Sequence, residues 1–135
     1  MIPAFDQHGY LPPGVHDPTI DEIADHFGRQ SEIRQVQMES LHWLFQAARR
    51  ARILRIVIDG SFTTDRLEPN DVDCALMTGP DMPPVLGSEF ESLGEIPFLH
   101  AVILDAGAFD AVVEELFGTD RWGNPKGIIE VRSWN

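Results

Sequence analysis

The segment 53–58 constrains the fold most, because it is almost continuously apolar and rich in β-branched residues. Such a run is typical of a central strand that is covered on both faces. Segments 71–77 and 97–105 are the next strand candidates, the first with polar residues at its start. The chain therefore contains at least three predicted strands.

Helical periodicity predicts the elements between these strands. Thr19-Ile20-Asp21-Glu22 matches a capping box, so a short helix is expected to begin at Thr19 and to end at Gly28. A longer helix is expected from 31 to 50, with others over 85–93 and 109–117. Helices that alternate with strands indicate a two-layer α/β or α+β domain.

The length of 135 residues favours one domain that covers residues 1–135. Segment 1–18 is interrupted by proline and glycine but keeps several apolar side chains, so we expect it to wrap over the body of the domain. Residues 121–131 are expected to form a turn followed by a short strand or helix.

The charge balance excludes some classes of function. With 22 acidic and 10 basic residues the net charge is −12, which disfavours nucleic-acid binding and suits divalent cations. The three tryptophans show no stacking pattern, which gives no support to a nucleic-acid platform. Cys74 is the only cysteine, so an internal disulfide and a cysteine zinc cluster are excluded. Neither a membrane span nor a signal peptide is evident, so a cytoplasmic protein is expected.

Two motifs at successive strands carry the chemistry. Asp71 and Asp73 are two residues apart, so on a strand both carboxylates would point to one face, where they could share Mg²⁺. With twelve aspartates in the chain, this spacing alone is a weak signal, and a solvated strand end is the simpler interpretation. Gly60 and Ser61 end the preceding strand, where glycine allows close backbone approach and serine can bind a phosphate.

The combination of an apolar strand, Gly60-Ser61, a spacer and Asp71-x-Asp73 resembles the signature of the polymerase-beta-type nucleotidyltransferase superfamily. Almost the whole chain is similar to small bacterial nucleotidyltransferase-like proteins. The similar stretches lie at 2–16, 60–73 and 123–128.

This resemblance implies a mixed β-sheet packed against helices, as in a nucleotidyltransferase palm, and Mg²⁺-dependent transfer of a nucleotidyl group from an NTP such as ATP. It implies that Asp71 and Asp73 are catalytic metal ligands and that Gly60 and Ser61 bind phosphates. Family members usually have a third carboxylate, for which Asp105 is the candidate. Asp105 could equally cap the following helix, and a register that puts Ala101 at this position would leave nucleotide binding without turnover.

Three further residues have two interpretations each, and His100 has one. Arg66 could bind phosphate or be a solvated loop residue, and Lys126 could contact phosphate, although a surface turn is favoured. Asp59 could cap the Gly-Ser turn or support the site, and His100 is expected to be a strand residue with a satisfied ring.

The sequence does not identify the acceptor of the nucleotidyl group. By analogy with small relatives it would be a protein partner, as in toxin–antitoxin pairs, and a second copy of the chain could also complete the site. The alternative function is a catalytically silent module with the same fold that binds a protein partner. A third is a domain that binds NTP without transfer.

Overall fold

The computed structural model describes residues 2–79 and 96–134. Its strands are β1 (Val15–His16), β2 (Arg55–Asp59), β3 (Val72–Met77), β4 (Leu99–Leu104) and β5 (Ile128–Glu130). Its helices are α1 (Ile20–Phe27), α2 (Glu32–Arg50), the 3-10 turn η1 (Ser61–Thr63), α4 (Ala106–Ala111) and the π-helical η3 (Val112–Leu116). The helix predicted over 85–93 lies outside the described residues.

The strands form one mixed sheet in the order β1-β5-β2-β3-β4. β3 runs antiparallel to β2 and parallel to β4, while β5 runs antiparallel to β2 and parallel to β1. The protein therefore has an α+β fold, and β2, the strand predicted to be central, lies in the middle of the sheet.

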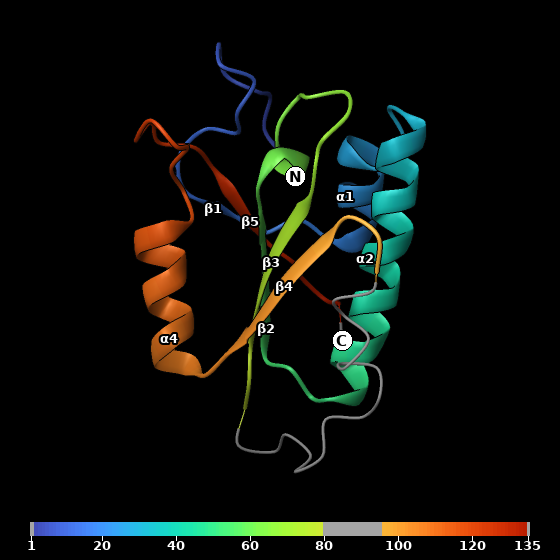
Figure 1. Cartoon of the computed structure of the whole chain (residues 1–135), viewed down its shortest axis with the longest axis vertical. Coiled ribbons are helices and arrows are strands. Elements are labelled where there is room, and N and C mark those ends of the chain that lie inside the picture. Colours follow the sequence, from blue (N-terminus) through green and yellow to red (C-terminus); the bar gives the residue numbers. More distant parts are fainter. Residues whose placement is uncertain (1, 80–95, 135) are drawn as a thin grey trace.

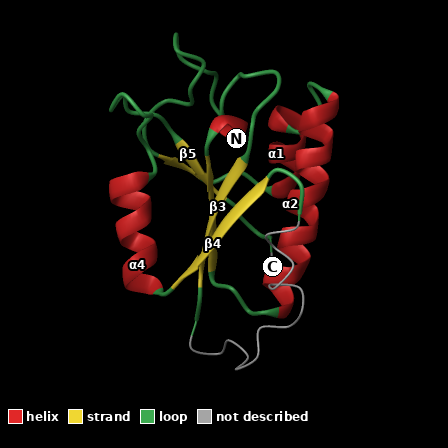
Figure 2. Cartoon of the chain, in the orientation of Figure 1, coloured by secondary structure: helices red, strands yellow, loops and turns green. Residues whose placement is uncertain are grey.

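Helices cover both faces of this sheet (Figure 1). One core joins α1 and α2 to side chains of β2 and β3 such as Ile58 and Leu76, and a smaller one joins Phe109 of α4 to Val57 and Ala75. Consecutive strand residues point to opposite faces, which explains why neighbouring residues belong to different cores. The two-layer expectation is therefore wrong: the sheet is the middle of three layers (Figure 2).

Helix boundaries follow the local signals. Thr19 and Glu22 form the predicted capping box at the start of α1, and Ser31 accepts a hydrogen bond from the Arg34 backbone at the start of α2. Asp105 caps α4 in the same way, so this helix begins earlier than the apolar pattern of 109–117 indicates. Among the described residues, no helix has both the length and the apolar character needed to cross a membrane.

The segment expected to lie over the domain contains a short strand. β1 pairs with β5, and the fully buried Leu11 belongs to the main core, with Ile2 and Phe5 packed against it. The Leu11 carbonyl accepts a hydrogen bond from the Gly127 backbone at 2.8 Å. The N-terminal segment and the chain that leads into β5 therefore support each other.

Candidate functional site

Three polar residues stand side by side at one end of the sheet. Asp59 of β2 is paired with Asp73 of β3, and Asp73 is paired with His100 of β4. Directly paired residues of neighbouring strands point to the same face, and here that face is the one covered by α4. Pairing of β3 with β2 on one side and with β4 on the other therefore fixes the backbone position of Asp73.

Gly60 allows the Asp73 carboxylate to lie against the end of β2. Its backbone has φ +85° and ψ −165°, a conformation found almost only in glycine. A Cβ atom added to Gly60 would lie 2.5 Å from Asp73 Oδ2. The close approach expected at Gly60 is thus present, and the group that approaches is one of the predicted metal ligands.

Ser61 is anchored by the loop that follows it. Its Oγ accepts a hydrogen bond from the Asn70 backbone at 3.1 Å, and its carbonyl accepts one from the Thr64 hydroxyl at 2.7 Å. A hydroxyl has one donor and two acceptor positions, so the bond from Asn70 leaves the O–H of Ser61 able to donate to a ligand.

The buried side chain of Arg34 in α2 forms hydrogen bonds to the same loop, which follows Ser61. Its guanidinium donates to the carbonyls of Phe27, Phe62, Thr64 and Arg66. Burial lowers the pKa of Arg34 to about 10, and the nearby Asp65 carboxylate opposes part of this shift. This role of Arg34 is not among the sequence-based predictions, although Arg34 falls at helical spacing on the stripe of Met38, Leu41 and Phe45.

Asp59 and Lys126 form a buried ion pair beside the paired aspartates. Lys126 Nζ lies 2.8 Å from Asp59 Oδ1, and the two side chains are 10% and 7% exposed. The preference for Lys126 as a surface-turn residue is therefore wrong. Like charges directly opposite on two strands repel, so the ammonium group offsets the proximity of the Asp59 and Asp73 carboxylates.

His100 also contacts Asp73. Its Nδ1 lies 3.2 Å from Asp73 Oδ1, and the imidazole is mostly exposed. His100 is thus a strand residue with a partner for its ring, as expected. The next residue of β4, Ala101, is paired with Cys74, whose side chain is buried. Burial raises the pKa of the Cys74 thiol, and the neighbouring Asp73 charge adds to the effect.

Asp59, Gly60, Ser61, Asp73 and Lys126 line an open cavity of about 720 Å³. A cavity of this size suits a small-molecule ligand. Four carboxylates and three cationic side chains contribute to its wall, together with Gly60, Ser61 and several aromatic residues. The charged members are Asp59, Asp65, Asp73, Asp120, Arg66, Arg121 and Lys126.

The predicted site residues do not all meet in this cavity. Gly60, Ser61, Arg66 and Asp73 line it together. Asp71 is exposed and immediately precedes β3, so the strand ladder does not fix its side chain. Among the described residues, no cluster of three or more His, Cys, Asp or Glu side chains could hold a metal ion.

Asp105 lies away from the cavity. It follows β4 at the end opposite to His100, five residues along the strand, which is roughly 16 Å. Its carboxylate accepts a hydrogen bond from the Ala108 backbone at 2.8 Å and caps α4. The capping alternative is therefore the one present, and the β4 residue opposite Asp73 is His100.

Another part of the cavity wall is formed by a turn over residues 119–125. Asp120 accepts hydrogen bonds from the Tyr10 hydroxyl, the Trp122 backbone and both nitrogens of Asn124. Partial burial raises the pKa of Asp120, but the bonds from Asn124, Tyr10 and Trp122 outweigh it and hold the pKa at about 2. The sequence predicts only a turn followed by a short strand or helix over residues 121–131.

Comparisons with known proteins give a family match. Residues 3–132 match the model of a family described as a family of unknown function, DUF6932. Neither the curated proteins nor the solved structures gave a match. The family match covers nearly the whole chain, including every residue that lines the cavity.

Proposed function

The chain belongs to the DUF6932 family, whose function is unknown, and on this premise we propose that it is a Mg²⁺-dependent nucleotidyltransferase. The observation that carries the proposal is the Asp73 carboxylate, fixed by two strands against Gly60 in a cavity whose wall also holds cationic side chains. The cavity therefore contains both a carboxylate that could bind a metal ion and cationic side chains that could bind phosphate groups.

The residues present fit a magnesium ion. Mg²⁺ is usually held by one or two carboxylates together with substrate phosphates, rather than by a cage made only of protein ligands. Asp73 would be one such ligand, and the exposed Asp71 just before the strand would be the second. Gly60 keeps the space beside Asp73 Oδ2 free of a side chain. His100 would orient Asp73 through its hydrogen bond, as outer partners of metal-bound carboxylates do.

The charge of the cavity makes magnesium a requirement for the proposed ligand. Because carboxylates slightly outnumber cations in the wall, a free triphosphate would meet no net attraction. Bound Mg²⁺ neutralises phosphate charge and stabilises displacement at phosphorus. The O–H of Ser61 and the guanidinium of Arg66 would donate to phosphate oxygens, and Lys126 would add positive charge behind them.

An NTP is the proposed donor and ATP the first to test, while the acceptor is proposed to be a protein partner, as in toxin–antitoxin pairs, or a second copy of the chain. The cytoplasm, which supplies NTPs, is the proposed location. Duplex nucleic acid is a poor candidate acceptor because of the net charge of −12.

The position of Asp105 favours a second candidate, a catalytically silent module. Transfer to a hydroxyl gains from a group that accepts the hydroxyl proton, and the carboxylate predicted for this task caps α4 instead. A silent module would bind a protein partner, with or without nucleotide, and would release no pyrophosphate.

Calorimetric titration with ATP, with and without Mg²⁺, tests the proposal. We expect Mg²⁺-dependent binding that falls at least tenfold in Asp73→Asn and less in Asp71→Asn. Asp105→Asn is the matched control, because Asn still caps a helix and the residue lies far from the cavity. Absence of Mg²⁺-dependent binding would overturn the proposal. Binding of MgATP without pyrophosphate release in the presence of cell extract would favour the silent module.

A further inference from the structure

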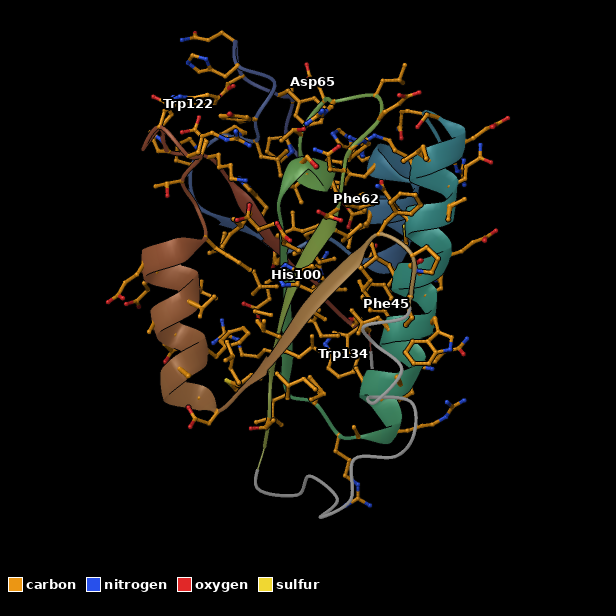
Figure 3. The ribbon with its side chains drawn as sticks, viewed as in Figure 1. Phe45, Phe62, Asp65, His100, Trp122 and Trp134 are labelled. Carbon is orange, nitrogen blue, oxygen red and sulfur yellow. The ribbon has the colours of Figure 1, made fainter. Side chains whose placement is uncertain are left out.

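Trp122 is an exposed aromatic side chain in the wall of the cavity. Its relative exposure is 75%, whereas Trp134 is 3% exposed and packs in the main core. Single exposed apolar residues are common on protein surfaces. Trp122 differs from such residues because it lines the same cavity as Gly60, Ser61 and Asp73. Figure 3 shows Trp122 and the lining residue Asp65 at the same end of the molecule.

The backbone that carries Trp122 is held in one conformation. The Trp122 N–H donates to Asp120 Oδ1 at 2.9 Å, and Asp120 Oδ2 in turn accepts from the Tyr10 hydroxyl at 2.9 Å. Thr119 and Pro125 form a bridge that closes the turn. Because the backbone of this turn is ordered, little backbone freedom is lost when Trp122 binds a ligand.

One face of the indole already has a cationic neighbour. The Arg121 guanidinium lies 5.4 Å from the centroid of the Trp122 ring, within the range of a cation–π contact. Both residues line the cavity. The remaining exposed surface of the ring is available to a second flat group, and the guanidinium keeps positive charge near it.

We propose that Trp122 is the platform on which the base of a nucleoside triphosphate stacks when its phosphates lie at the Gly60–Asp73 end of the cavity. This inference rests on the proposed function and adds a base-binding residue to it. Every base has a π face, so a single aromatic platform selects a base weakly. We therefore expect all four NTPs to bind, with purines a few-fold tighter because their rings cover more of the indole.

The test compares ATP with inorganic tripolyphosphate, which has the phosphates but no base. We expect Trp122→Ala to weaken MgATP binding about tenfold, the usual scale for loss of one stacked base. The affinity for magnesium tripolyphosphate should stay the same. Trp122→Phe keeps an aromatic ring and should retain most of the affinity. MgATP should also quench tryptophan fluorescence in the wild type more than in Trp122→Phe.

The outcomes separate this inference from the proposed function. If MgATP binding depends on Asp73 but is unchanged in Trp122→Ala, the platform is overturned and the proposed function stands. Equal losses for MgATP and tripolyphosphate also overturn the platform, because Trp122 would then act only through the turn. Binding that needs Trp122 but neither Mg²⁺ nor Asp73 supports the platform and contradicts the proposed function. No binding of ATP to the wild type overturns both.

Discussion

Among single residues, Gly60 gives the sharpest stability prediction. Alanine at this position meets an unfavourable backbone conformation, which costs about 1–3 kcal/mol, and its Cβ would lie too close to Asp73 Oδ2. We expect Gly60→Ala to lower the free energy of unfolding by about 3 kcal/mol in urea denaturation. The loss should be smaller by about 1 kcal/mol in an Asp73→Ala background, because neighbouring residues are not additive.

Equal losses in the two backgrounds would contradict the close contact between Gly60 and Asp73. Gly123→Ala is a useful reference, since Gly123 has φ +82° and no atom within 4 Å of an added Cβ. Gly123→Ala therefore measures the loss of unfolding free energy that positive φ causes when no carboxylate lies beside the added Cβ.

Residues of the candidate site differ in how far the sequence predicts them. Gly60, Ser61 and Asp73 follow from local spacing, because residues 60–71 directly connect two neighbouring antiparallel strands and bring them together. The places of Lys126 and Asp105 relative to the site depend instead on contacts between segments that are far apart in the sequence. The burial of Lys126 requires the placement of the chain before β5, and the register of β4 puts His100 rather than Asp105 beside Asp73.

Among the elements, the turn over 119–125 gives a pH prediction. In the folded protein the pKa of Asp120 is about 2, below its ordinary value of 3.8. A depressed folded pKa means that Asp120 contributes stability that is fully present above about pH 4 and is lost as the pH falls towards 2. We expect Asp120→Asn to be less stable than the wild type at pH 7, with the difference shrinking over this window.

Thermal unfolding at several pH values between 7 and 2 measures this difference. A difference between wild type and Asp120→Asn that stays constant from pH 7 to pH 2 would refute the assigned role of the ionised carboxylate. Asn124→Ala removes the side-chain donor to Asp120 Oδ2 and should shift the acid transition to higher pH than in the wild type.

Elements with strong local signals were predicted well. Thr19 and Ser31 mark helix starts through caps, which depend only on neighbouring residues. β1 was missed because a two-residue strand exists only through its pairing with β5. The layer count was wrong because periodicity gives the apolar face of a helix but not the face of the sheet on which the helix packs.

Across the whole molecule, Leu11 links the N-terminal segment to the core. Its side chain is fully buried, and its carbonyl accepts the Gly127 N–H. Leu11→Ala is expected to lower the free energy of unfolding by about 2–5 kcal/mol, the usual cost of such a cavity. Leu67→Ala is the control, because Leu67 is 59% exposed and its loss should matter by at most about 0.5 kcal/mol. If urea denaturation gave similar losses of unfolding free energy for Leu11→Ala and Leu67→Ala, the burial of the N-terminal segment would be contradicted.

The residues that line the cavity come from the segments 8–10, 59–73 and 117–126, which lie far apart along the chain. At a synthesis rate of roughly 5–20 residues per second, the second stretch leaves the ribosome several seconds before the third. A nascent chain therefore carries Asp73 and Gly60 before it carries Lys126 and Trp122. Any ligand of this cavity can assist folding only after residues 117–126 have left the ribosome, and a chain stalled before residue 117 should not retain it.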